Sequence, residues 1–203
     1  MRRAQDGLGE DPSDRVFGRS FAVLSLALLA AEDLRRPIMN RAGFDELLNV
    51  GLLALKRQRD LRGYVEHKGW AHATAHAADL LKFLGRNSKL TASDRARIVV
   101  GVDGRLQSAG QVFVWGEDAR LAAALRAVAV REEVDVSPFM KWCSQVRSDN
   151  DVLWGGTFDA SRYLAVRAQL NAMAQLLSAL PLNTSGRTDA IVQSLRAALM
   201  AAN

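Results

Sequence analysis

The sequence predicts an all-α protein of about eight helices. Apolar residues recur at helical spacing in long segments, for example at Phe44, Leu47, Leu48, Leu52 and Leu55, and this period of about 3.6 residues is the main signal of an amphipathic helix. No segment alternates apolar and polar residues over a strand's length between hairpin turn signals. Because the connections between successive helices are short, we expect antiparallel pairs, stacked as a small HEAT-like solenoid or as an irregular bundle.

Capping residues, glycines and prolines set the expected helix boundaries. Thr91 followed by Asp94 resembles a capping box, and Ser137-Pro138 places a proline at the first position of a helix. Residues 148–157 are polar and contain glycine, which predicts a loop. The expected helices cover residues 14–34, 43–58, 69–85, 91–106 and 117–131, then a helix from 137, a long one through 166–180 and a last one through 191–199.

Composition points to one folded domain. The 203 residues are 49% apolar and 24% charged, which is ordinary for a globular chain. We expect a single helical domain over residues 1–203, with residues 1–12 as a flexible N-terminal segment. The net charge of +5 is spread along the chain without a run of Lys or Arg longer than two residues, so nucleic acid is not an expected partner.

Membrane insertion and export are not expected either. The longest apolar run, Phe21 to Ala31, is shorter than the roughly 20 residues of a membrane-spanning helix. Glu10, Asp11 and Asp14 precede it, where a signal peptide would be positively charged. The single cysteine, Cys143, excludes an internal disulfide, and a cytoplasmic location is the expectation.

Polar and ionisable groups concentrate between Asp60 and Leu84. All three histidines of the chain lie there. On a helix, His72, His76 and Asp79 stand at positions i, i+4 and i+7, within a sector of about 60°. Buried imidazoles and carboxylates need partners, because an unsatisfied polar group costs on the order of 1 to 3 kcal/mol. This stripe therefore predicts a polar core network or a cleft.

Three interpretations of the stripe remain open. His72, His76, Asp79 and Glu66 could converge on a cavity as acid–base or ligand-binding groups. They could instead form a satisfied network that pins the preceding loop to the helix. Metal binding has suitable spacing, but without a His-Glu-x-x-His motif or a second histidine cluster no metal ligand set is assigned. No phosphate loop or dinucleotide fingerprint occurs, so no cofactor is expected.

Further candidates surround the stripe. Trp115 precedes the expected helix at 117, whose first turn carries Glu117 and Asp118. The helix dipole alone also favours acids at this position. Acids beside aromatic rings suit a cationic or polyhydroxylated molecule, such as an amino sugar or an aminoglycoside antibiotic. The candidate ligand-binding residues are Asp60, Arg62, Tyr64, His67, Trp70, Trp115, Glu117 and Asp118.

Two phrases resemble a known bacterial family. They are Val16-Phe17-Gly18-Arg19-Ser20-Phe21, and the run from Asp60 to Leu81 that holds Gly69-Trp70-Ala71-His72. The chain is similar in these phrases to the domain of unknown function (DUF) 2785 family. The resemblance implies an all-helical fold and no established activity. Relatives usually have a longer N-terminal part, so the resemblance also implies that a helix pair is missing here or is supplied by a second copy in a homodimer.

Two functions from different classes follow as hypotheses. The first is a cytosolic helical protein whose cleft binds, and as an enzyme alters, a small polar or cationic molecule, in a resistance-type role. In that case His72, His76 or Glu66 acts as general base, and Arg62 or Lys68 orients an anionic or hydroxyl group. The alternative is a helical-repeat interaction scaffold in which the network of His72, His76 and Asp79 is structural.

Overall fold

The structure is a computed structural model that describes residues 1–132, 134–181 and 186–202. Among these residues are nine helices and one short β-hairpin, so the all-α prediction is confirmed. The elements are α1 (Arg2–Gln5), α2 (Arg15–Arg35), α3 (Arg41–Arg57), β1 (Tyr64–Val65), β2 (Gly69–Trp70), α4 (Ala73–Arg86), α5 (Ala92–Gln107), α6 (Glu117–Ala129), α7 (Ser137–Trp154), α8 (Ala160–Ala179) and α9 (Gly186–Ala201).

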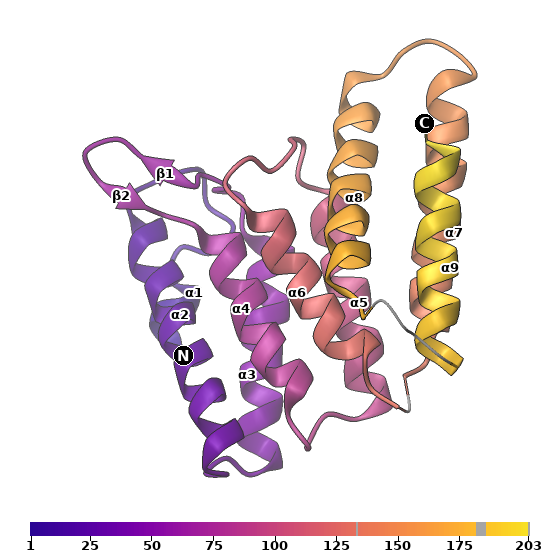
Figure 1. The fold of residues 1–203 in the computed structure, drawn as a ribbon. Coiled ribbons are helices and arrows are strands. Elements are labelled where there is room, and N and C mark those ends of the chain that lie inside the picture. The colour runs from indigo at the N-terminus through magenta and orange to yellow at the C-terminus, as the bar shows by residue number, and fades with distance from the viewer. Residues whose placement is uncertain (133, 182–185, 203) are drawn as a thin grey trace.

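The long helices form two layers (Figure 1). Helices α2, α4, α6 and α8 lie side by side in one layer, and α3, α5, α7 and α9 form the other. Successive helices run antiparallel, as short connections require. The α3–α4 and α5–α6 connections therefore lie at one end of the stack, the upper end in Figure 1, and the α4–α5 and α6–α7 connections lie at the other. This alternation is the arrangement of a short α-solenoid.

One apolar core joins the layers. Its buried side chains extend along the chain from Ala4 to Ala198 and include Phe44, Phe139 and Trp142. The central helix α4 contacts α2, α3 and α6, and its alanines are buried. Small side chains allow neighbouring helices to approach closely, and this explains why α4 carries so little charge. Helix α4 is therefore central to the fold.

The segment 64–72 differs from the prediction of a helix that begins at residue 69. Tyr64 pairs with Trp70 and Val65 with Gly69 in an antiparallel hairpin. Gly69 has a φ of 88° and His72 a φ of 50°, and these left-handed conformations cannot belong to a right-handed helix. The helix therefore starts at Ala73. His72 precedes it, so the expected stripe loses its first helical position.

Two further boundaries differ from expectation. α7 continues to Trp154 through the predicted loop 148–157, because Asn150 and Leu153 are buried on the face that it turns inward. Within the N-terminal segment that was expected to be flexible, residues 2–5 form a short helix whose Ala4 is buried in the core. No helix in the described part of the chain is long and apolar enough to cross a membrane.

Candidate functional site

Backbone pairing fixes the position of His72 at the upper end of the stack. The hairpin continues beyond its two strands: Ala71 N–H donates to Gly63 O (2.8 Å) and His72 N–H donates to Arg62 O (3.1 Å). The carbonyl of His72 accepts the first helical hydrogen bond of α4, from His76 N–H. A non-glycine residue in the left-handed region costs about 1 to 3 kcal/mol and is typical of functional sites. His72 is therefore held in one strained conformation between the hairpin and α4.

The side chain of His72 joins the hairpin to the loop before α6. Its Nε2 lies 3.0 Å from the carbonyl oxygen of Trp115 and 3.6 Å from a carboxylate oxygen of Glu117. Because a carbonyl only accepts hydrogen bonds, Nε2 carries the proton of the neutral ring. Nδ1 is then unprotonated and has no bonded partner among the described residues.

His76 is held by α2. Its Nδ1 lies 2.7 Å from the hydroxyl oxygen of Ser20, which donates its own proton to the carbonyl of Ala71. The hydroxyl can therefore only accept from the imidazole, so Nδ1 of His76 is protonated and Nε2 is free. The ring of Phe21 meets the imidazole edge to face, with 5.4 Å between centroids. The two histidine rings are 6.0 Å apart.

Burial keeps His76 neutral. Removal from water lowers the pKa of its imidazole, and the charge of a protonated His72 lowers this pKa further. The contact with Ser20 and the charge of Asp79 raise the pKa, but by less. A neutral imidazole with a free Nε2 can accept a hydrogen bond or a proton. His76 is thus the residue of the site that is best prepared for proton transfer.

Asp79 raises the pKa of His76 through its charge, but its hydrogen bonds go to other residues. Its carboxylate receives Lys82 Nζ at 2.8 Å and Arg120 Nη1 at 2.7 Å. Only a small part of this carboxylate is exposed, and both of its oxygens are engaged. Asp79 therefore joins α4 to α6. Neither of its carboxylate oxygens is free to act as the acid or base that the sequence predicted.

Three aromatic rings form an exposed surface beside the histidines. Tyr64, Trp70 and Trp115 are each exposed by nearly half, at 47%, 45% and 46%. Trp70 lies 5.5 Å from Tyr64 and 5.7 Å from Trp115 between ring centroids, and 4.9 Å from the ring of His72. Large aromatic side chains left open to solvent in a group are typical of binding surfaces. We call these three residues the aromatic surface.

Glu117, at the start of α6, holds this surface together. Glu117 is 1% exposed, and its carboxylate accepts the N–H of Trp115 at 3.0 Å. This contact fixes the backbone of Trp115. It thereby positions both the indole ring and the carbonyl that His72 binds. Asp118 is partly exposed and its carboxylate bonds the N–H of Ala119. Glu117 therefore belongs to the site, whereas Asp118 fits the helix-dipole interpretation.

A pocket of about 440 Å³ adjoins the aromatic surface. It lies between residues 59–64 and the loop 109–115, and Tyr64 and Trp115 belong to its wall. Asp60 and Arg62 also line it, joined by two hydrogen bonds of 2.9 and 2.6 Å. Asp60 is fully buried. The pocket thus brings together four of the predicted ligand-binding residues. The histidine pair, His72 and His76, is not part of its wall.

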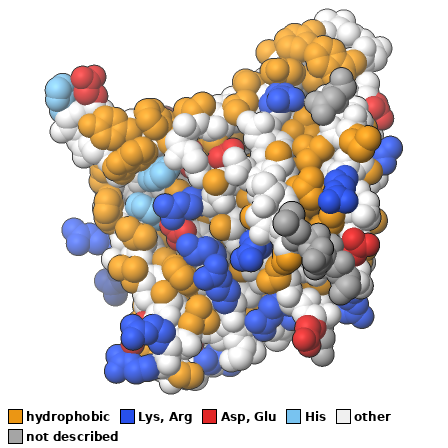
Figure 2. Space-filling model, in the orientation of Figure 1, with side chains coloured by type: hydrophobic (Ala, Val, Ile, Leu, Met, Phe, Trp, Pro, Cys, Tyr) orange, Lys and Arg blue, Asp and Glu red, His pale blue; other side chains and the backbone are white. Residues whose placement is uncertain are grey.

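Glu66 and His67 lie outside the site. They occupy the tip of the hairpin, where their side chains are 85% and 90% exposed and 3.6 Å apart. Figure 2 shows histidine side chains at two places, one at a projecting tip beside acidic side chains and a pair on the body of the molecule. Because the hairpin extends the loop away from α4, the predicted convergence of Glu66 with His72 and His76 does not occur.

Sequence reasoning missed Ser20, Phe21 and Arg120. The first two face His76 from α2, and the third pairs with Asp79 from α6. One signal was present, because Ser20 and Phe21 both lie in the first phrase that carries the family resemblance. Nothing in the spacing along the chain marks Arg120, since it reaches the site only through the packing of α6 on α4.

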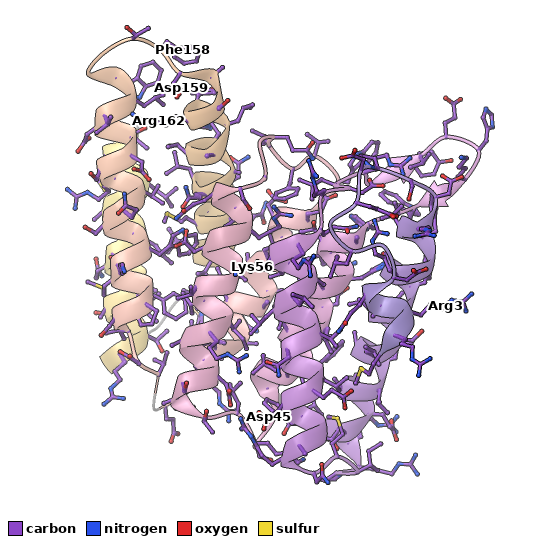
Figure 3. The ribbon with its side chains drawn as sticks, turned by 180° about the vertical axis from the view of Figure 1, so that it is seen from behind. Arg3, Asp45, Lys56, Phe158, Asp159 and Arg162 are labelled. Atoms are coloured by element: carbon purple, nitrogen blue, oxygen red, sulfur yellow. The ribbon has the colours of Figure 1, made fainter. Side chains whose placement is uncertain are left out.

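In the part of the chain that the structure describes, no metal ligand set and no second aromatic group lies at the site. Within the described ranges, no group of three or more His, Cys, Asp or Glu residues could hold a metal ion. A second aromatic group, Trp154, Phe158 and Tyr163, surrounds the α7–α8 connection. Figure 3 shows Phe158 and Asp159 at that connection, away from α3 and its Lys56. Asp159 caps α8 there.

Comparison with known proteins adds the family. No curated protein and no solved structure matches the chain. One family model matches residues 5–182 of the 203, and its description reads "Protein of unknown function (DUF2785)". This match includes α2, the hairpin, α4 and α6, which together carry the histidine pair and the aromatic surface. The chain therefore belongs to the DUF2785 family.

Proposed function

We propose that the aromatic surface, with His72 and His76 at its edge, binds a small polar molecule built on a ring, such as a sugar or an amino sugar. The observation that carries the proposal is the juxtaposition of three half-exposed aromatic rings with two imidazoles, each of which has one ring nitrogen that bonds no other described residue. Aromatic faces stack against the apolar faces of a ring, while imidazole nitrogens accept hydrogen bonds from hydroxyl or amino groups.

The charges around the site favour a neutral or singly charged ligand over a polycation. Glu117 is engaged with Trp115 and His72. Asp79 is neutralised by Lys82 and Arg120. An aminoglycoside carries several ammonium groups that need carboxylates of their own. Of the ligands considered, a polyhydroxylated ring therefore suits this site better than an aminoglycoside.

His76 supplies the chemistry if the bound molecule is altered. Its Nε2 is unprotonated, and its Nδ1–H is fixed by Ser20. Burial holds the imidazole pKa below its ordinary value, so the ring stays neutral near pH 7. Nε2 is then placed to accept a hydrogen bond from a ligand hydroxyl and to act toward it as a general base, with His72 Nδ1 as a second acceptor.

Ligand-observed NMR with three probes tests the proposal. Glucose, glucosamine and kanamycin are added in turn to the full chain, and saturation transfer from protein to probe is measured. We expect transfer to glucose or glucosamine, lost in Trp70→Ala and at least about tenfold weaker in His76→Ala. His67→Ala is the matched control for the histidines, because that ring is exposed at the hairpin tip. Trp154→Ala is the control for the indole, since it belongs to the other aromatic group.

The scaffold interpretation predicts a different result. In a purely structural network, His72→Ala and His76→Ala lower the melting temperature, and none of the three probes receives saturation in any variant. That outcome would refute the proposal that the aromatic surface binds a ligand. It is also refuted when binding survives Trp70→Ala and Trp115→Ala together, because the ligand would then lie elsewhere.

A further inference from the structure

Arg95 is a buried arginine whose guanidinium has no partner among the described residues. It lies in the first turn of α5 and only 8% of it is exposed. Among the residues that the structure describes, no oxygen accepts a hydrogen bond from its guanidinium, and its Nε is sealed from solvent. A charged group at this depth normally has a paired anion, because burial of an unpaired charge is strongly unfavourable. The position of Arg95 therefore favours an anion as its partner.

The guanidinium faces a polar pocket. Arg95, Val130, Arg131 and Glu132 line a space of about 380 Å³ between the start of α5 and the segment that follows α6. Of the three guanidinium nitrogens of Arg95, only Nε is both sealed from solvent and unpaired, and Arg95 belongs to the wall of this space. Arg131 is held beside it by a hydrogen bond of 3.3 Å from Nη1 to the carbonyl of Arg86. Two guanidinium groups thus share one pocket.

None of the described acids beside this pocket bonds Arg95 or Arg131. Asp94, next to Arg95 in sequence, bonds Thr91, Arg41 and Arg97. Glu132 is exposed and has no bonded partner among the described residues. The carboxyl end of α6 adds a partial negative charge, which the amino end of α5 offsets. Among the described residues that line the pocket, two arginines therefore face one carboxylate, and it bonds neither of them.

We propose that this pocket binds a phosphate group between Arg95 and Arg131. The planar fork of a guanidinium matches a tetrahedral oxyanion with two parallel hydrogen bonds, and such charge-assisted bonds are the strong ones. The site lies at the opposite end of the helices from the aromatic surface and is independent of it. The phosphate is either the free inorganic ion or part of a small phosphate ester, for which a pocket of this size leaves room.

Thermal unfolding of the full chain tests the site. The melting temperature is measured against rising inorganic phosphate, with sodium chloride at matched ionic strength as reference, since an anion that binds only the folded state stabilises it. A parallel titration with glycerol 3-phosphate distinguishes an ester from the free ion. We expect phosphate, glycerol 3-phosphate or both to raise the melting temperature beyond chloride. Arg95→Met abolishes this rise, and Arg131→Met weakens affinity at least about tenfold.

Two further variants keep the test decisive. Arg97→Met is the matched control, because Arg97 lies on the same helix and is already paired with Asp94 and Asn49; the phosphate response stays. Glu132→Gln removes the competing carboxylate and should tighten phosphate binding several-fold, which ³¹P line broadening measures. This variant keeps the proposal testable even if Arg95→Met does not fold. Equal melting temperatures in phosphate, glycerol 3-phosphate and chloride overturn the proposal. So does a Glu132→Gln variant that is less stable and no more responsive, since Glu132 is then the partner of Arg95.

Discussion

Nδ1 of His76 lies 2.7 Å from the hydroxyl oxygen of Ser20, and this contact joins α4 to α2 beside the aromatic surface. Because Ser20 donates to the carbonyl of Ala71, the hydroxyl has only a lone pair to offer the imidazole. One serine thus selects the tautomer of His76, and Nε2 becomes the nitrogen that faces any ligand.

Ser20→Ala should change the tautomer of His76. The variant leaves Nδ1–H and the Ala71 carbonyl without their partner, which costs about 1 to 3 kcal/mol of unfolding free energy. The proton then moves toward Nε2, a change that imidazole ¹⁵N chemical shifts report directly. Ser25→Ala is the control on the same helix, because that hydroxyl bonds only the carbonyl of Phe21. Unchanged ¹⁵N shifts in Ser20→Ala would show that the contact does not select the tautomer.

His76 should make the protein less stable in mild acid. Its folded-state pKa lies below the unfolded value of about 6.5, because of burial first and His72 second. Between these two pKa values the unfolded chain binds more protons, so the unfolding free energy falls as the pH drops below about 6.5 and levels off below the folded pKa. One such group contributes at most about 1.4 kcal/mol per pH unit.

Urea unfolding between pH 8 and pH 5 measures this slope. His76→Asn removes the contribution of the imidazole and should flatten the curve over that window. His67→Asn should not, because its side chain is 90% exposed. Identical slopes for the wild type and His76→Asn would mean that other groups cause the acid sensitivity.

Helix periodicity and capping residues were sufficient to predict the long helices. The capping box at Thr91 and the proline at the start of α7 stand where the sequence indicates. The hairpin was missed because each strand has only two residues, too few for a visible alternation. Its turn also depends on a left-handed His67, and a non-glycine residue in that conformation gives no sequence signal.

The site was predictable only in its sequence-local part. His72, Trp70 and Tyr64 lie in one stretch, so their proximity follows from the chain itself. The partners of His76 and Asp79 come from α2 and α6, which neighbour α4 only through the two-layer packing. Glu66 appeared equivalent to the others in sequence, but the hairpin carries it into solvent. Sequence spacing within one helix is informative, whereas contacts between helices require the fold.

Asp33→Asn should destabilise the fold strongly. The Asp33 carboxylate is buried, which raises its pKa, but hydrogen bonds from Met39 N–H, Asn87 and Ile38 N–H outweigh burial, and the pKa falls far below its usual range. Its ion pair with Lys89 adds to this. The substitution leaves that ammonium unpaired and should cost about 2 to 4 kcal/mol.

Denaturant unfolding at pH 7 and pH 3 checks the role of Asp33. A carboxylate with a lowered pKa stabilises the fold above the unfolded value of about 3.9, and this contribution is lost as the pH falls through the folded pKa. The difference between wild type and Asp33→Asn should therefore shrink at pH 3. Asp45→Asn is the control, because its ion pair with Arg41 is exposed and worth at most about 1 kcal/mol.

Gly63→Ala should disrupt the aromatic surface without touching its rings. A Cβ atom at Gly63 would overlap Cβ, Cγ and Cδ1 of Trp115, so rotation of the indole alone cannot relieve the clash. The Trp115 backbone must move, and with it the carbonyl that His72 binds. We expect a loss of about 1 to 3 kcal/mol of unfolding free energy, a shift of the Trp115 indole N–H resonance, and weaker binding of the sugar probes. Gly104→Ala is the control, because an added Cβ there meets no atom within 4 Å, and alanine in a helix is favoured by about 0.5 to 1 kcal/mol. A Gly63→Ala protein with the wild-type indole resonance and full stability would contradict the close contact between Gly63 and Trp115 on which the geometry of the site depends.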